Sequence, residues 1–292
     1  MKKVLCLLLM WVGVSMAAPV KLASLHPLLS DMAKRVGGEQ VEVVDLFPVN
    51  AELHSFAPSG AELAAAVGCR AVLACGKGVE PYLKDLREAL AGRAPVVELG
   101  AKVPDVRVPG SLAVDPHWWN APQNMKRASL ELLALLKEAD ADHAAEYEMR
   151  QRGYAQDMDK LVSRAKLALA GIPAKRRVLV CAHAAMCHFC ESFRFTPIAA
   201  QGIAKESEGD MARMAALLAE LRERQVRCVF VELRDSPKFL ENIAAQVGAR
   251  VGTLVMDGVS PEHADYEGMF MYNVESIRDG LTSDEPSQQS AL

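Results

Sequence analysis

Hydrophobic and polar positions follow the same pattern in two separate stretches of the chain, where short apolar runs alternate with amphipathic segments. In the first stretch this pattern predicts strands at 20–25, 41–47, 71–75, 95–99 and 111–115, with helices at 27–38, 59–67 and 79–92. In the second it predicts strands at 177–182, 197–202, 228–233 and 251–256, with helices at 189–193, 211–225, 238–248 and 271–281. Alternation of this kind is typical of a parallel α/β sheet.

Between the two stretches, residues 122–170 carry no strand signal and favour helix almost throughout. The second part, from Ala141 onward, predicts one helix about 42 Å long at 1.5 Å per residue, which Gly171 and Pro173 end. We therefore predict an α/β protein with two parallel-sheet lobes joined by one long α-helix. Its expected parts are a first lobe at 18–121, a linking helical segment at 122–171, a second lobe at 172–282 and a disordered tail at 283–292.

The chain begins with a short basic and apolar segment. Lys2 and Lys3 precede an apolar run to about Val14, and small residues follow up to Ala18. This order is typical of a secretory signal peptide, here residues 1–17. The run is shorter than the roughly 20 residues that span a bilayer. We expect a soluble protein exported to the periplasm.

The net charge limits the classes of binding partner, and the cysteine count bears on disulfide bonds. The chain has 33 basic and 37 acidic residues, for a net charge of −4, and loss of the two leader lysines makes it more acidic. This balance argues against nucleic acid and anionic membranes as partners. Six cysteines remain beyond the leader, an even number that permits disulfides without fixing their pairing.

Four residues that can bind a metal follow predicted strands: His54 and His117 in the first stretch, His183 and Asp257 in the second. Ligands of open α/β sheets bind beyond the carboxyl ends of the strands. If the lobes face each other, the four side chains can converge in the cleft between them, and three imidazoles with one carboxylate suit zinc. A single histidine at a strand end is more often a hydrogen-bonded structural residue, so spacing alone leaves both interpretations open.

The chain resembles the solute-binding proteins of zinc and manganese ABC transporters, whose lobes are joined by a single rigid helix. The resemblance runs from about Val20 to Leu281. It is carried by "HSFAPSGAEL", by "DPHWWNAPQN", by "AHAAMCHFCESF" and by "VMDGVSPEHADYEGMFMYNVESI". Three features depart from the family pattern. The first histidine segment has Phe-Ala-Pro-Ser where the family often has Tyr-Glu-Pro-Thr, "NAEL" replaces the usual Gly-x-Asp-Pro before that histidine, and the histidine-rich loop of many zinc importers is absent.

The resemblance implies that His54, His117, His183 and Asp257 hold the metal, with Zn²⁺ favoured over Mn²⁺ because a histidine stands at position 183. It also implies an ABC permease in the inner membrane as partner, a monomer in solution and no enzymatic activity. Whether a separate metallochaperone loads the site is left open. The alternative is an exported zinc hydrolase that uses the same cluster. Such an enzyme needs an open position for water, which four protein ligands would fill.

The stretch "CAHAAMCHFC", residues 181–190, is dense in cysteine and histidine. Read alone, it suits a zinc cluster, a redox centre or a crowded core segment. With the resemblance, His183 becomes its single metal ligand. Cys187 and Cys190 are then expected to be a buried pair or a structural disulfide rather than a redox centre, and His188 to pack or hydrogen-bond on its helix.

Two further expectations concern neighbours of the site. Cys181 lies two residues before His183 on a strand, so both side chains should point to the same side. His26 follows the first strand, and among the remaining histidines it is the one that could line the cleft and contact a ligand.

Overall fold

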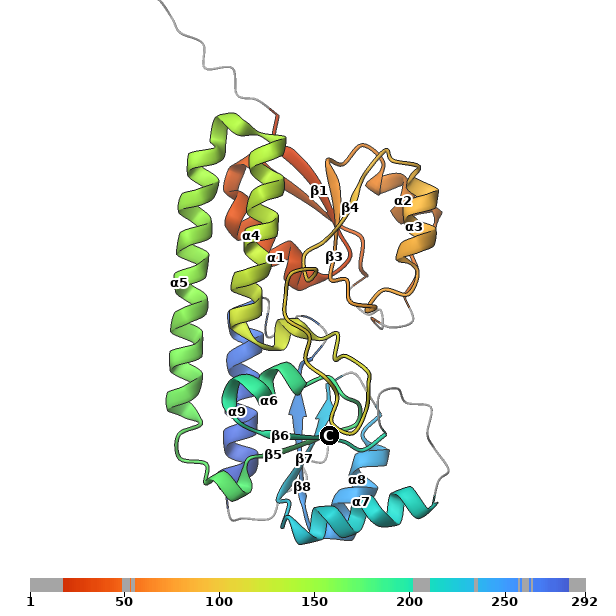
Figure 1. The fold of residues 1–292 in the computed structure, drawn as a ribbon, viewed down its shortest axis with the longest axis vertical. Helices are drawn as coiled ribbons and strands as arrows, with labels where there is room; N and C mark the ends of the chain where they lie inside the picture. The colour runs from red at the N-terminus through yellow and green to blue at the C-terminus, as the bar shows by residue number, and fades with distance from the viewer. Residues whose placement is uncertain are drawn as a thin grey trace, which may run out of the picture.

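The structure is a computed structural model that describes residues 18–48, 53, 56–201, 211–233, 236–256, 258, 263 and 265–283. The predicted signal peptide and residues 284–292 of the predicted tail lie outside this part of the chain. Two lobes stack along the long axis of the molecule, with long helices along one side (Figure 1).

The first lobe is built on a four-stranded parallel sheet with the strand order β2-β1-β3-β4. Its central strands, β1 and β3, are the most apolar and the most buried, as expected of a sheet covered on both faces. The strands are β1 (Val20–Ser24), β2 (Val41–Asp45), β3 (Ala71–Ala74) and β4 (Val96–Glu98), and the helices are α1 (Pro27–Gly37), α2 (Gly60–Ala66) and α3 (Leu83–Leu90).

The second lobe repeats the arrangement with the strand order β6-β5-β7-β8, again all parallel. Its strands are β5 (Val178–Cys181), β6 (Thr196–Ala199), β7 (Cys228–Glu232) and β8 (Arg250–Leu254). Its helices are α6 (Cys187–Phe193), α7 (Met211–Glu223), α8 (Lys238–Val247) and α9 (Tyr266–Thr282). The two sheets confirm the predicted fold class.

Two antiparallel helices connect the lobes: α4 (Pro122–Ala139) rises along the first lobe, and α5 (Ala144–Ala168) returns along the length of both (Figure 1). Helix α5 has 25 residues and begins after a single 3₁₀ turn, Ala141–His143. At this turn Asp140 accepts hydrogen bonds from the His143 ring and from the Tyr147 hydroxyl. The long linking helix predicted from the sequence is therefore present, three residues shorter at its start.

Ion pairs fix α5 to both lobes. Arg35 of α1 contacts Asp157 at 2.8 Å, and Arg164 of α5 pairs with Glu267 of α9. Beneath them runs one continuous apolar core that includes Trp119 of the first half and Phe270 of the second. Because side chains of both lobes share this core, the lobes and the linking helices pack as one body.

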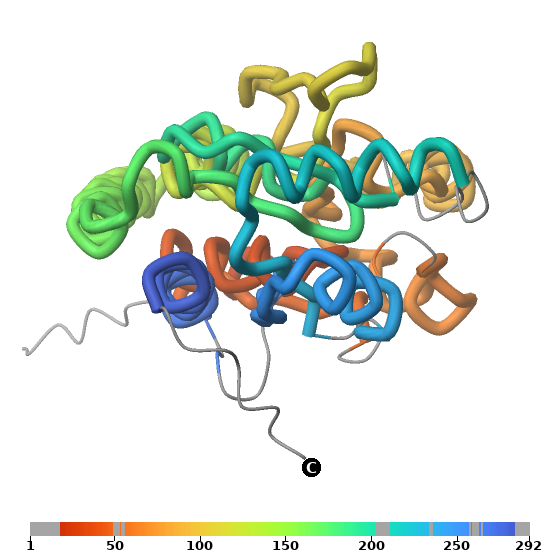
Figure 2. Tube along the Cα trace, turned by 90° about the horizontal axis from the view of Figure 1, so that it is seen from below, coloured from red at the N-terminus to blue at the C-terminus, as the bar shows by residue number. Residues whose placement is uncertain are grey.

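The segment between β4 and α4 departs from the sequence prediction. Residues 111–115 were expected to form a strand, and the structure has only an isolated antiparallel bridge between Arg107 and Val114. This loop, yellow in Figure 1, descends from the first lobe onto the second, and Figure 2 shows it standing out from one side of the molecule. The prediction was wrong because the segment pairs with its own loop and not with the sheet.

None of the helices in the described ranges is both long enough and apolar enough to cross a membrane.

Candidate metal centre

Asp115 accepts the hydrogen bonds that organise the candidate metal centre. It is fully buried, and one carboxylate oxygen accepts from the His117 backbone N–H at 2.9 Å and lies 2.7 Å from His117 Nδ1. The other oxygen accepts from the backbone N–H of Cys187 at 2.8 Å. Burial alone would raise the pKa of Asp115, but the hydrogen bonds from His117 and the electrostatic interaction with its ring outweigh it and hold that pKa below its usual value. Asp115 is therefore a carboxylate that links the first lobe to the start of α6.

The carboxylate also sets the chemistry of His117. With Asp115 accepting at Nδ1, the ring proton resides on Nδ1, and Nε2 becomes the basic nitrogen. Metal-binding histidines in proteins are commonly oriented by such a partner. His117 is 3 % exposed and belongs to the short turn that ends in the 3₁₀ segment η2 (Trp118–Asn120).

His183 lies opposite, in the turn that follows β5. Its ring centroid is 5.3 Å from that of His117, with the ring planes at 63°. It is 5 % exposed. The structure thus brings together one predicted ligand from each half of the chain, both nearly buried, at the carboxyl end of the second-lobe sheet.

The other two predicted ligands, His54 and Asp257, lie outside the described residues, so their roles stay predictions. Residues beside Asp257 are described: the Met256 carbonyl accepts from Trp119 Nε1 at 2.7 Å, and Gly258 lies so near Pro27 that a Cβ added to it would be 3.0 Å from the Pro27 Cγ. Within the described ranges no three His, Cys, Asp or Glu side chains are arranged to hold a metal ion. A complete shell around His117 and His183 would therefore need ligands from outside those ranges.

Segment 115–120 ties the two lobes together around this pair of histidines. Besides the Asp115 contact with α6, Asn120 Nδ2 donates to the Ala185 carbonyl at 2.9 Å. The Tyr266 hydroxyl of α9 donates to the Trp119 carbonyl at 2.7 Å. Trp118 Nε1 donates to the carbonyl of Cys75 at the end of β3. The segment that carries His117 is thus held in place by buried hydrogen bonds on several sides.

The sequence prediction gave no role to Asp115. Its signal was present in the Asp-x-His spacing, which lets a carboxylate reach the backbone and ring of a histidine two residues later. His188 was expected to pack or hydrogen-bond on its helix; its ring nitrogens lie 3.0 Å from Asn124 Nδ2 and from the Asp115 carbonyl oxygen, both outside α6. His188 therefore belongs to the same network and supports Asp115 from α6.

The cysteines of the stretch 181–190 do not have the environment of a redox centre. Those described at positions 69, 75, 181, 187, 190 and 228 are buried thiols outside any disulfide. Burial, and then the nearby Asp115 carboxylate, raise the pKa of Cys187 to about 12. Burial also raises the pKa of Cys190 well above its usual value. Redox cysteines need a lowered pKa, so the buried-pair interpretation is the one that fits.

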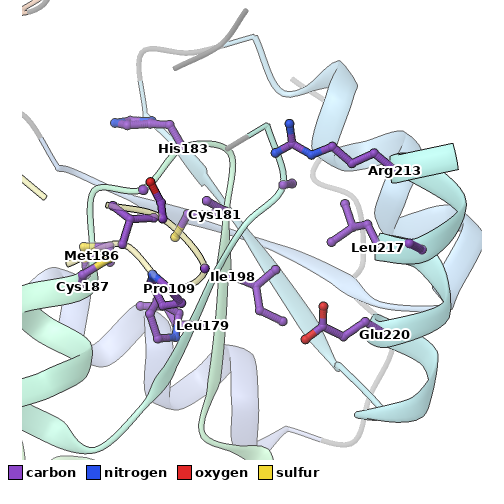
Figure 3. Close-up of a pocket in the computed structure, with 18 residues that line it drawn as sticks. Pro109, Leu179, Cys181, His183, Met186, Cys187, Ile198, Arg213, Leu217 and Glu220 are labelled. Carbon is purple, nitrogen blue, oxygen red and sulfur yellow. The ribbon is translucent and has the colours of Figure 1, made fainter. Parts of the chain in front are cut away.

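A cavity of about 710 Å³ opens beside His183 in the second lobe (Figure 3). Cys181, the last residue of β5, and His183, which follows the strand, are both among the residues that line it. Arg213 and Glu220 of α7 line the opposite wall. The imidazole of His183 points away from this wall (Figure 3).

Comparison with known proteins gives a consistent result. The profile of the family described as ZnuA, zinc-uptake complex component A periplasmic, matches residues 22–280. The manganese-binding lipoprotein MntA of Bacillus subtilis is 24 % identical over 265 residues, covering 87 % of each chain. The iron-binding protein YfeA of Yersinia pestis is 24 % identical over 271 residues, covering 91 % of this chain and 87 % of its own.

A solved structure has the same fold. The periplasmic zinc binding protein TroA of Treponema pallidum superposes with a TM-score of 0.82 and 22 % identity, covering 91 % of this chain and all of the other. The arrangement of two parallel-sheet lobes is therefore shared with this metal-binding protein.

Proposed function

The chain belongs to the ZnuA family of metal-binding, solute-binding components of ABC metal uptake systems, and from this premise we propose that it captures Zn²⁺ for import. Members of this family bind metal for transport and are not enzymes, so the alternative of a zinc hydrolase is set aside. One observation supports the choice of site. The ring centroids of the buried His117 and His183, one from each half of the chain, lie 5.3 Å apart, and the buried Asp115 carboxylate orients the His117 ring.

We propose His54, His117, His183 and Asp257 as the ligands. The relatives are named for manganese, iron and zinc, so the choice of ion rests on the donor chemistry. Imidazole nitrogens with one carboxylate suit zinc, whereas manganese prefers a shell richer in oxygen. A nearly buried, tetrahedral shell that protein side chains fill would hold the ion without leaving a position for catalysis.

The family implies a permease as the partner that receives the metal. We further propose that the protein works in the periplasm as a monomer after loss of residues 1–17. Loading by a separate metallochaperone remains an additional proposal. The acidic balance of the chain supports an aqueous compartment and a cationic cargo rather than a polyanionic partner.

Elemental analysis tests the proposal. The mature protein, stripped with a chelator and reloaded from an equimolar mixture of Zn²⁺ and Mn²⁺, should retain about one zinc per chain. His183→Ala should lose most of that zinc. His143→Ala is the matched control, because His143 contacts Asp140 at the start of α5 and should leave binding unchanged. Retention of manganese in place of zinc would refute the choice of ion, and unchanged zinc in His183→Ala would refute the site.

A further inference from the structure

His26 is a buried histidine with one nitrogen already committed. It lies between β1 and α1, is fully buried and caps α1: its Nδ1 accepts from the backbone N–H of Leu28 at 3.2 Å. A nitrogen that accepts from an N–H carries its lone pair there, so the proton of the neutral ring is on Nε2. His26 is therefore an N–H donor whose Nε2 faces away from the helix that it caps.

That donor has no acceptor among the described residues. Nε2 of His26 is buried and lacks a hydrogen-bond partner there. Native proteins rarely leave a buried donor unmatched, so an acceptor outside the described set is expected. The ring stays neutral, since burial first and the electrostatic interaction with His117 second lower its pKa to about 3. A neutral N–H does not repel a cation nearby, and it cannot bind one.

The surroundings of His26 belong to the candidate metal centre. Its ring centroid is 4.8 Å from that of Trp119, and the Trp119 centroid is 5.3 Å from that of His117. Trp119 also donates to the Met256 carbonyl, and a Cβ added to Gly258 would lie 3.0 Å from the Cγ of Pro27, the residue after His26. The residues on both sides of the proposed ligand Asp257 thus lie near the immediate neighbours of His26.

We propose that His26 is a positioning residue of the metal centre, whose Nε2–H donates a hydrogen bond to an anionic oxygen bound to the metal. The proposal rests on the proposed function, because it needs the ion to be present. The oxygen belongs either to the carboxylate of Asp257 or to a metal-bound water or hydroxide. Both sources offer the same chemistry, an acceptor that becomes stronger and better ordered when the donor fixes it.

Two substitutions separate the cap from the donor. His26→Asn keeps an acceptor at the position of Nδ1 and remains a good helix cap, but has nothing at the position of Nε2. His26→Gln reaches the position of Nε2 with an amide N–H, but loses the cap. Zinc affinity is measured by competition with a chromophoric chelator, and the Tm of the metal-free protein by circular dichroism.

We expect His26→Asn to bind zinc about tenfold more weakly with little change in the metal-free Tm. His26→Gln should retain affinity close to the unmodified protein while its Tm falls by about 2–4 °C. If His26 had a purely structural role, His26→Gln would lose more zinc affinity than His26→Asn, because loss of the helix cap would then determine the affinity. Unchanged affinity in His26→Asn, or equal loss of affinity in both variants, would overturn the proposal.

The source of the oxygen is identified in an Asp257→Ala background, with a weaker chelator as competitor. If the effect of His26→Asn on affinity disappears there, the acceptor is the Asp257 carboxylate; if it persists, the acceptor is a metal-bound water or hydroxide. An unmodified protein that binds no zinc would refute the proposed function and the role of His26 with it, whereas the outcomes above refute the role of His26 alone, so the two failures are distinguishable.

Discussion

Asp115→Asn is the substitution that most directly tests how the site is held. The carboxylate accepts at both ends: from the backbone and ring of His117 on one oxygen, and from the Cys187 N–H on the other. A carboxamide of the same shape accepts at one end only and donates at the other. Whichever way it turns, a donor therefore faces either α6 or His117.

The magnitude follows from the two orientations. If the amide NH₂ faces Cys187, two buried donors meet and the metal-free protein loses about 1–3 kcal/mol of unfolding free energy. If it faces His117, the ring proton moves to Nε2 and the nitrogen that would bind the metal is blocked. In both cases His117 loses its charged partner. We expect zinc affinity to fall about 10–100-fold, or about 1.4–2.7 kcal/mol.

Chelator competition gives the affinity, and urea unfolding of the metal-free protein gives the stability. The matched control is Asp105→Asn in the same loop: its carboxylate is mostly exposed, pairs with Lys77 and should affect neither quantity beyond the noise. If Asp115→Asn binds zinc within twofold of the unmodified protein while His117→Ala loses binding, the view of Asp115 as the group that prepares His117 is refuted.

Two further predictions use the neighbours of the site. The pKa of His26 is about 3 in the folded protein against 6.5 for the free side chain, so the unfolded chain binds the proton more readily between these values and stability falls as pH falls. Between pH 7 and pH 5 the metal-free protein should lose about 2 kcal/mol more than His26→Asn does, as measured by urea unfolding; equal losses would contradict this. Once residues 1–17 are removed, Trp118 and Trp119 are the only tryptophans. Because the Trp119 ring lies 5.3 Å from that of His117, zinc should change the emission, and Trp119→Phe should remove most of the change while Trp118→Phe should not. Bound zinc with constant emission would argue against His117 as a ligand.

The fold was predictable because its signals are local. Strand and helix alternate with clear apolar periodicity, and Gly171 and Pro173 mark the end of the long helix. The strand expected at 111–115 failed because an apolar run shows β propensity without showing which partner it finds. Here the partner is Arg107 of the same loop, not the sheet.

Less of the candidate site could be predicted from the sequence, because its main contacts join residues that are far apart in the sequence. Asp115 meets Cys187 across 72 positions, and Trp119 meets Met256 across 137. Histidines 117 and 183 could be proposed from their places after predicted strands, but their approach to 5.3 Å depends on how the lobes pack. Only the Asp115–His117 pair carries a local signal, the spacing of two residues.

The hydrogen bonds of segment 115–120 bear on how long a captured ion stays. A swing of one lobe away from the other would break the links to Cys187, Ala185 and Met256 together. At about 1 kcal/mol each, and more for the charged one, such opening is populated in fewer than about one molecule in a hundred. Residence time is then governed by local side-chain exchange around the ion. A permease that accelerates release must act on those few side chains rather than pull the lobes apart.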